Sequence, residues 1–385
     1  MGTMNISKEG LVLASVLLCA GVWSHGPRTI GGFDPGPRRP IDLVICLDTS
    51  NSMDHLIDSA RAKLWEVVTQ LSQARPEPYL RVGLLTYGSP GVSTAAAGWV
   101  VRQIDLSDDL DLLYSRLMAL RTNGGDEFVG WVLRDAVQTM NWSPDPSALK
   151  MIFVAGNESA DQGSSQVNFR NVAEQAKVKG IAINALFCGP EEIGRNDRWA
   201  DVALYGGGAF TAIDMACGTL QIQTPFDREL IELNVQLNAT YVPFGRVGEA
   251  GERRQRDQDA ASEKMGIQTE ASRVAAKATG VYQNAQWDLV DASTAGDFRL
   301  EAVAETELPT EMQRMNKQER AQHLETKRAR RSEVQKKIQD AGSRRDEFLQ
   351  KQSENAAGGK QSLDAALRQI TQQQAEKKGF TFEKQ

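Results

Sequence analysis

Five consecutive residues, Asp48-Thr49-Ser50-Asn51-Ser52, place one carboxylate and two serine hydroxyls within a single turn of the chain. They directly follow the apolar run at residues 41–47 and precede apolar residues at helical spacing from Ile57 onward. Carboxylate and hydroxyl oxygens are the ligands that hard divalent cations such as Mg²⁺, Mn²⁺ or Ca²⁺ take in proteins. The alternative interpretation is that these side chains only cap the helix that follows. Their place at the end of a buried strand favours a metal site.

The residues around this pentapeptide alternate between strand-like and helix-like segments. Apolar-rich runs typical of buried strands cover residues 41–47, 79–87, 98–104, 149–155, 181–187 and 210–214. Segments with helical spacing lie between them, at residues 57–71, 107–119, 127–140 and 166–178. Strands separated by crossover helices predict an α/β fold with a doubly wound, mostly parallel sheet. Sites in such sheets form at the carboxyl ends of the strands, where the pentapeptide lies.

The D-x-S-x-S string after the first strand resembles the start of the metal ion-dependent adhesion site (MIDAS) of the von Willebrand factor A (VWA) family. The resemblance covers residues 41–220 and includes a second loop, Asn123-Gly124-Gly125-Asp126-Glu127. Segments 153–158, 186–189 and 287–291 are similar to those of uncharacterised bacterial VWA proteins with a helical C-terminal tail. The resemblance implies a VWA/Rossmann-like fold, a bound divalent metal and a protein ligand whose carboxylate completes the metal's coordination.

The third loop of the site departs from the family pattern. The family usually has an Asp after the fourth strand, within a T-D-G-E string, and this chain has Ala155-Gly156-Asn157-Glu158 there. In the second loop the family usually offers a Thr, and this chain has Asp126, as many bacterial-type members do. Two carboxylates therefore remain for a dication, with Asn157 or Glu158 as a further ligand. The predicted metal ligands are Asp48, Ser50, Ser52, Asp126 and Glu158. The alternative is a degenerate site that binds metal weakly or not at all.

The N-terminal residues predict export. Lys8 precedes an apolar run, small residues follow, and a cleavage site before His25 defines a signal peptide at residues 1–24. A retained anchor and lipidation at Cys19 are the alternatives, although the run is shorter than the roughly 20 residues that span a bilayer. Residues 25–40, rich in Gly and Pro, predict a linker. We expect a periplasmic or secreted protein that contacts a membrane only if the segment is retained as an anchor.

Beyond the VWA-like region the chain becomes polar and mainly helical. Residues 224–308 are expected to form a helical or irregular connecting region, because Thr224-Pro225 caps and opens a helix. Residues 309–385 are expected to form a long charged helix and a terminal helix, and the VWA-like region is expected to fold without them. The long helix has a heptad seam that charged residues interrupt, so a coiled coil, a helical hairpin and an extended stalk are alternatives. The seam comprises Leu324, Val334, Ile338, Ala341 and Phe348, interrupted by Lys327, Arg331 and Arg345.

What the sequence lacks disfavours several classes of function. The net charge of −6 and the absence of a dominant basic face argue against nucleic-acid binding. The three His residues are scattered without a zinc spacing, and neither a nucleophile elbow nor a phosphate-binding glycine loop occurs. We therefore expect a non-enzymatic protein-binding module that uses a metal site. The alternative is a metal-independent envelope scaffold that acts through its helical tail.

The export interpretation predicts where the mature protein begins. Protein purified from the native host should start near His25, because the residues before it form the expected cleavage site. N-terminal sequencing or intact-mass measurement checks this expectation. Cytoplasmic, soluble protein that retains Met1 would show that the apolar segment is not an export signal.

Overall fold

The computed structural model describes residues 38–90, 93–213, 222–294, 298–355 and 363–382. The predicted export segment and most of the predicted linker lie outside these residues. Among the helices that the structure describes, none is long and apolar enough to cross a membrane.

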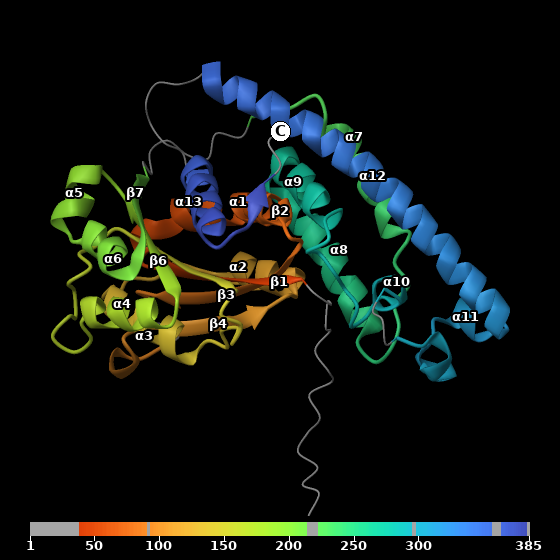
Figure 1. The fold of residues 1–385 in the computed structure, drawn as a ribbon, viewed down its shortest axis with the longest axis horizontal. Coiled ribbons are helices and arrows are strands. Elements are labelled where there is room, and N and C mark those ends of the chain that lie inside the picture. Colours follow the sequence, from red (N-terminus) through yellow and green to blue (C-terminus); the bar gives the residue numbers. More distant parts are fainter. Residues whose placement is uncertain (1–37, 91–92, 214–221, 295–297, 356–362, 383–385) are drawn as a thin grey trace, which may run out of the picture. The chain divides into compact units, whose positions relative to one another are not determined.

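A six-stranded sheet forms the centre of the VWA-like region (Figure 1). Its strands lie in the order β4-β3-β1-β5-β6-β7, and every neighbouring pair is parallel except β3 and β4. This arrangement confirms the doubly wound, mostly parallel sheet that the sequence predicts. The strands are β1 (Arg39–Asp48), β3 (Pro78–Tyr87), β4 (Val101–Ser107), β5 (Leu149–Gly156), β6 (Ile181–Cys188) and β7 (Gly207–Ile213).

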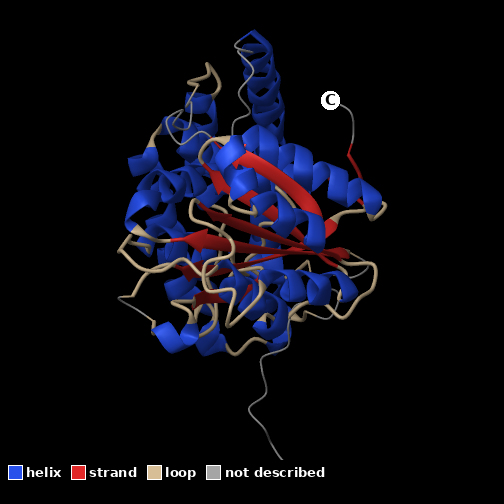
Figure 2. Ribbon diagram, turned by 90° about the vertical axis from the view of Figure 1, so that its left-hand side faces the viewer, coloured by secondary structure: helices blue, strands red, loops and turns tan. Residues whose placement is uncertain are grey.

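Helices cover both faces of this sheet (Figure 2). Side chains of β1 alternate between the faces, so Leu43 joins one hydrophobic cluster and Val44 the other. The cluster of Leu43 includes residues of α1 (Asp54–Ser72) and α2 (Leu110–Ala119). The cluster of Val44 includes residues of three further helices, which are α3 (Val129–Thr139), α4 (Phe169–Val178) and α6 (Trp199–Gly206). The short helix α5 (Glu191–Asn196) packs beside β6 and β7.

The strand order places β1 at the topological switch point of the sheet. β1 pairs in parallel with β3 on one side and with β5 on the other. The chain runs from β1 through α1 to β3, and it later reaches β5 on the opposite side. The loops that leave the carboxyl end of β1 and its neighbours therefore diverge, and the space between them is where such sheets bind ligands.

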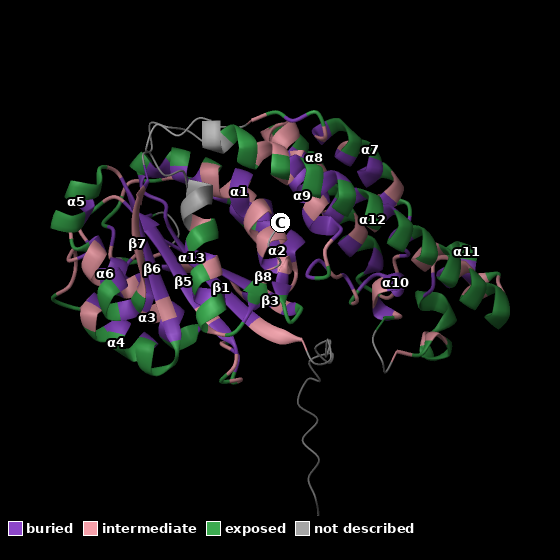
Figure 3. Cartoon of the chain, turned by 45° about the horizontal axis from the view of Figure 1, so that its top comes forward, coloured by how far each residue is buried: buried purple, intermediate pink, exposed green. Residues whose placement is uncertain are grey.

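The C-terminal region is mainly helical, as the sequence predicts. Two short strands, β2 (Ala74–Arg75) and β8 (Thr381–Phe382), form an antiparallel pair between the VWA-like region and the end of the chain. In Figure 3 the strands of the central sheet are mostly buried, whereas α12 exposes much of its length. The helices are α7 (Asp227–Asn238), α8 (Gly248–Met265), α9 (Ile267–Lys277), α10 (Leu289–Ala292), α11 (Thr310–Gln313), α12 (Lys317–Asn355) and α13 (Leu363–Lys377).

One hydrophobic cluster joins this helical region to the sheet. It contains Leu43 of β1 and Trp65 of α1, and also Ile338 of α12, Ile370 of α13 and Phe380 beyond α13. The tail therefore completes a core that begins in the VWA-like region. We expect removal of residues 309–385 to expose apolar side chains of α1 and to destabilise the sheet, in place of the independent folding that the sequence suggests.

The heptad seam of α12 is buried within the chain itself. Val334, Ile338 and Ala341 pack on α7 and α9, and Leu324 packs with residues of α10. The arginines that interrupt the seam have buried counter-ions. Arg331 contacts Asp288 and Asp291 at 2.6 Å each, and Arg345 contacts Asp227 at 2.9 Å.

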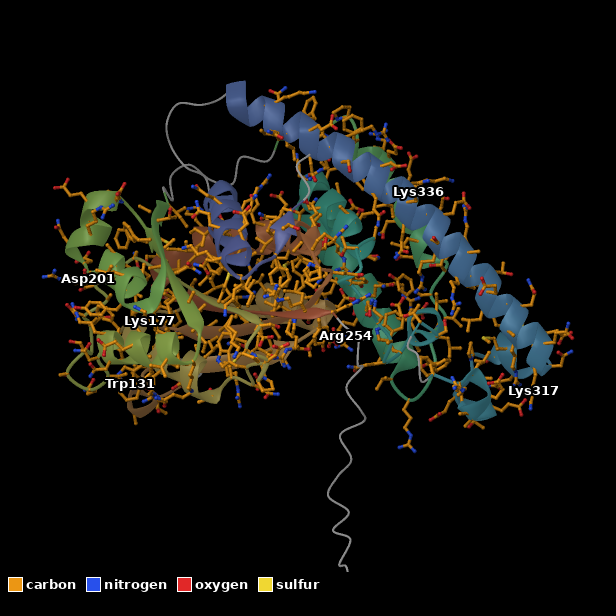
Figure 4. All side chains as sticks on the ribbon, in the orientation of Figure 1. Trp131, Lys177, Asp201, Arg254, Lys317 and Lys336 are labelled. Carbon is orange, nitrogen blue, oxygen red and sulfur yellow. The ribbon has the colours of Figure 1, made fainter. Side chains whose placement is uncertain are left out.

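A second buried ion network connects α2 to the helices that follow the VWA-like region. The guanidinium of Arg273 on α9 contacts Asp111 of α2 at 2.8 Å and Asp259 of α8 at 2.6 Å. Arg254 of α8, labelled in Figure 4, pairs with Asp109 at the start of α2 at 2.9 Å. These contacts fix the helical region on the side of the sheet that α1 and α2 cover.

Replacing one arginine of the seam tests this arrangement. Arg331→Ala should lower the free energy of unfolding by about 3–5 kcal/mol, because it leaves the buried Asp288 without its cation. Arg330→Ala is the matched control, since the neighbouring Arg330 is exposed and its contacts with Glu333 and Gln236 lie at the surface. It should change stability by less than about 1 kcal/mol. Urea unfolding measures both. Equal losses in the two variants would contradict the buried pairing.

Candidate metal site

Asp48 ends β1 and is fully buried between the neighbouring strands. The backbone N–H of Ser50 donates to its Oδ1 at 2.7 Å, as in a tight turn that begins a helix. Its second oxygen, Oδ2, is buried and has no hydrogen-bond partner. Asp48 therefore offers one oxygen to the loop and keeps the other free.

The two serine hydroxyls lie beside each other next to this carboxylate. Thr49 anchors the loop, because its N–H and its hydroxyl both donate to the carbonyl oxygen of Tyr87 at 2.8 Å. Ser50 is buried and Ser52 is exposed, and their Oγ atoms are 3.2 Å apart. The amide of Asn157 donates to Ser52 Oγ at 3.1 Å. The first and third loops therefore meet at the carboxyl end of β1.

In the second loop it is Glu127, and not Asp126, whose side chain faces Asp48. Asn123 N–H donates to Thr49 O at 2.9 Å, which holds this loop against the first. Asp126 is exposed, whereas Glu127 is 6% exposed, and both Asp48 Oδ1 and Glu127 Cγ lie against Gly88. Glu127 Oε2 is buried without a partner. The structure thus brings Asp48, Ser50 and Ser52 together, and it supplies a carboxylate from the position after the predicted one.

Gly88 permits the close approach of the two acids. It follows β3 with a φ of 81°, a backbone conformation that favours glycine. A Cβ on Gly88 would lie 2.6 Å from Asp48 Oδ1 and 3.2 Å from Glu127 Cγ. Any larger residue here would push the two carboxyl groups apart.

Gly156, which stands at the position of the usual family Asp, has no room for a side chain. A Cβ there would lie 2.4 Å from the hydroxyl oxygen of Tyr87 and 3.3 Å from the Cβ of Asp48. The buried Tyr87 hydroxyl donates to the carbonyl oxygen of Ala155 at 3.0 Å. Burial, with Asp48 and Glu127 nearby, raises the pKa of Tyr87 well above its usual range, so the phenol keeps its proton. Tyr87 therefore fills the space that an Asp side chain would need.

Glu158, the remaining predicted ligand, lies at the edge of the site. It is exposed, and its backbone carbonyl accepts a hydrogen bond from the indole of Trp199 at 2.7 Å. Partial burial, followed by the charges of Glu127 and Asp197, raises its pKa. The structure does not bring the Glu158 carboxylate into contact with Asp48.

The two inward-facing acids repel each other, because both are buried and no arginine or lysine of the described residues forms an ion pair with either. Burial, followed by the hydrogen bond to Glu127 and by its charge, raises the pKa of Asp48 well above the usual range, against the lowering effect of Ser50. In the part of the chain that the structure describes, six acidic side chains are buried. Four of them contact an arginine and two do not. The paired acids are Asp42 with Arg81, Asp111 with Arg273, Asp227 with Arg345 and Asp288 with Arg331, and the unpaired acids are Asp48 and Glu127.

These residues fit a divalent cation. Asp48 Oδ2 and Glu127 Oε2 are buried oxygens without partners, and the hydroxyls of Ser50 and Ser52 lie beside Asp48. Two carboxylates match the charge of a dication, and all the donors are oxygen. Across the described ranges, no three His, Cys, Asp or Glu side chains gather in a metal-binding arrangement. A metal here would therefore be held by two carboxylates together with hydroxyls.

Sequence reasoning located the first loop and missed three residues that shape the site. Asp126 and Glu127 are consecutive acids, and no local pattern shows which of them turns inward. Tyr87 ends the predicted strand at residues 79–87 and Gly88 follows it. The one feature of the sequence that pointed to them was this position at a carboxyl end of the sheet.

Comparison with known proteins gives one family and several distant structures. Residues 42–197 match the family model described as von Willebrand factor type A domain. None of the curated proteins compared with the chain matches it. Among solved structures, an aerotolerance-related membrane protein from Bacteroides fragilis is 15% identical, with a TM-score of 0.31, over 45% of this chain and 92% of that one.

Two further structures share the similarity. The pilus adhesin SpaC from Lactobacillus rhamnosus GG is 16% identical, with a TM-score of 0.36, over 48% of this chain and 29% of that one. A proximal thread matrix protein from the mussel byssus, described with a zinc-occupied MIDAS motif, is 12% identical, with a TM-score of 0.35, over 46% of this chain and 43% of that one.

The repulsion between the two acids predicts a pH dependence for the metal-free protein. A carboxyl whose pKa is raised in the folded state stabilises the fold below its unfolded pKa, and this contribution is lost as pH rises through the folded pKa. Asp48→Asn removes the titrating group, so the stability of the variant relative to wild type should increase from acidic to mildly alkaline pH.

Urea unfolding in EDTA at several pH values measures this difference. Asp126→Asn is the control, because Asp126 is exposed and should show no such trend. If wild type instead gained stability over Asp48→Asn as pH rises, Asp48 would have a favourable charge partner and the two acids would not repel.

Proposed function

Because residues 42–197 form a von Willebrand factor type A domain, a module that mediates protein–protein interaction and often carries a MIDAS, we propose that this chain binds a protein ligand through a divalent metal site. The proposed ligands are Asp48, Ser50, Ser52 and Glu127. The observation that carries the proposal is the pair of buried carboxylates without an arginine, since the other four buried acids among the described residues each contact one. A bound cation is the partner that this pair lacks.

The proposed ligand set differs from the set that the sequence predicts. Glu127 takes the role expected of Asp126, because it faces Asp48 and its free oxygen is buried. Asp126 and Glu158 remain exposed at the edge of the site. When bound, Mg²⁺, Mn²⁺ or Ca²⁺ supplies an open coordination position for a carboxylate of the partner. Buried Asp48 and Ser50 hold the inner side, and the exposed Ser52 lies toward the partner.

We propose that the chain is non-enzymatic. His55 on α1 is exposed, and the inward-facing acids are buried in a position where they match the charge of a metal. The interaction site supports this role over the alternative of a scaffold that acts through its helical tail. The seam of α12 that a partner helix would need is occupied by α7, α9 and α10 of the same chain.

The domain boundaries and the export of the chain are part of the same proposal. A VWA domain at residues 41–220 is followed by the helices of residues 224–385, which complete its core. A protein-binding module of this kind suits the periplasm or the cell exterior, where the predicted export segment would deliver it.

A metal titration tests the proposed site. Thermal unfolding of wild type should shift to higher temperature with Mg²⁺ or Mn²⁺, because a ligand that binds only the folded state stabilises it by about 2.7 kcal/mol at one hundred times its Kd. Asp48→Asn and Glu127→Gln should each abolish most of this shift. Asp126→Asn should keep it, since its carboxylate faces solvent.

Each result discriminates between the alternatives. A shift lost in Asp126→Asn and kept in Glu127→Gln would restore the ligand set predicted from the sequence. A flat wild-type response up to millimolar Mg²⁺, Mn²⁺ and Ca²⁺ would overturn the metal site and favour the scaffold.

A further inference from the structure

Three acidic residues lie in the loops that border the proposed metal site. We name Asp126, Glu158 and Asp197 the acidic rim. Asp126 and Glu158 are exposed, and Asp197, at the end of α5, is half-buried. Arginines of the neighbouring loops are engaged elsewhere. Arg195 pairs with Glu191, Arg198 lies 3.8 Å from Asp201, and Arg121 donates to the backbone carbonyls at the end of α2.

One backbone contact joins the loop of Glu158 to Asp197. The N–H of Ala160 donates to the carbonyl oxygen of Asp197 at 2.9 Å, which joins the loop after β5 to the end of α5. The charges of both Glu127 and Asp197 act on Glu158. Asp126 precedes Glu127 directly in the chain. The rim therefore borders the pair of buried acids on the side of the second loop and on the side of the third.

Two buried acids lie beside the acids of the rim, and this distinguishes the edge from an ordinary acidic surface. Asp48 Oδ2 and Glu127 Oε2 are buried oxygens without partners, and Asp48 is fully inaccessible to solvent. A dication held between these two carboxylates would be neutralised by them. None of the three rim acids has an ion-pair partner among the described residues, so their charges would remain available to a partner at the coordination position.

We propose that the ligand of this face is a basic protein segment, in which the coordinating carboxylate is flanked by Lys or Arg side chains. This inference rests on the proposed function, because it takes the metal as the anchor for the carboxylate. An isolated acidic segment would meet three like charges on approach. In a segment whose carboxylate is flanked by Lys or Arg, the carboxylate binds the metal and the flanking side chains are attracted to the rim. Charge complementarity therefore favours such a segment.

The strength of this selection depends on ionic strength. Exposed ion pairs each change affinity by about 1.5- to 5-fold, so three of them together give a preference of about tenfold at low salt. The Debye length falls from roughly 10 Å at 0.1 M salt to roughly 3 Å at 1 M. The preference should therefore shrink at high salt, whereas direct coordination to the metal should persist.

Synthetic peptides are suitable probes for the full-length chain. One peptide carries a central Asp between lysines, the second carries the same Asp between glutamates, and the third replaces the central Asp of the first with Asn. Binding is measured by fluorescence anisotropy in Mg²⁺ and in EDTA, at low and high salt. The first peptide should bind about tenfold more tightly than the second in Mg²⁺ at low salt, and the third should bind weakly.

Two triple variants separate the rim from general electrostatics. Combining Asp126→Asn, Glu158→Gln and Asp197→Asn should remove most of the preference for the lysine-flanked peptide and leave the Mg²⁺-dependent rise in melting temperature intact. The matched control combines Glu174→Gln, Glu232→Gln and Asp257→Asn, three exposed acids on α4, α7 and α8. It carries the same change in net charge and should keep the preference.

The outcomes distinguish this inference from the proposed function. Equal or tighter binding of the glutamate-flanked peptide, with Mg²⁺ and the central Asp still required, would overturn the basic partner and leave the metal site standing. Loss of the Mg²⁺-dependent melting shift in the rim variant would make its members ligands and overturn the rim. Lysine-dependent binding that ignores both Mg²⁺ and the central Asp would be adsorption and would overturn both. Absence of binding by the lysine-flanked peptide at millimolar concentration also overturns the inference.

Discussion

Two carboxyl groups buried side by side repel each other, and the carboxyl edge of this sheet is arranged so that they stay there. Gly88 leaves room for both, Thr49 fixes the turn of the first loop, and the Tyr87 hydroxyl fills the space beside Gly156 next to Asp48. Each of these residues restricts the loops more than a simple helix cap would require. The repulsion is tolerated because the surrounding strands position Asp48 at the centre of the sheet.

The other buried acids among the described residues all contact an arginine. Arg273 forms ion pairs with Asp111 and Asp259, and Arg331 forms ion pairs with Asp288 and Asp291. Removing the partner from a buried charge is strongly destabilising, so these arginines hold the helical region in one arrangement. The same chemistry thus has two uses. Where an arginine of the chain is the counter-ion, the acids build the interface between helices. Where no arginine contacts them, at Asp48 and Glu127, they form the proposed metal site.

The sequence predicted the sheet well because its strands are buried on both faces and their apolar runs are long. The run at residues 149–155 corresponds to β5 (Leu149–Gly156) almost residue for residue. The same pattern located the first loop of the site, since D-x-S-x-S follows β1 directly. Local sequence patterns did not predict side-chain orientations that depend on residues distant in the sequence. Nothing near Glu127 shows that Gly88 leaves space for its side chain, because Gly88 lies in another loop.

The long helix α12 shows the same limit more strongly. Arg331 and Arg345 interrupt its heptad seam, and in sequence they argue against burial. Their counter-ions lie 43 and 118 positions away, at Asp288 and Asp227, so no window along the helix contains the reason for them. Four of the five apolar members of the predicted seam are buried, and Phe348 is half-buried. What covers that face is set by α7, α9 and α10, which propensity alone does not place.

Residues that follow α13 contact the first strand of the sheet, and this affects how the protein folds during synthesis. Arg39, the first residue of β1, donates to the carbonyl of Lys378, 339 positions later, and its guanidinium lies 4.6 Å from the centre of the Phe380 ring. Phe380 is buried in the cluster that also contains Ile41. During synthesis the sheet can form early on the ribosome, but one side of its core stays uncovered until the last helix has emerged. Contacts this distant in sequence slow folding. If the chain is exported as proposed, this delay would keep its last helices unpacked while translation continues.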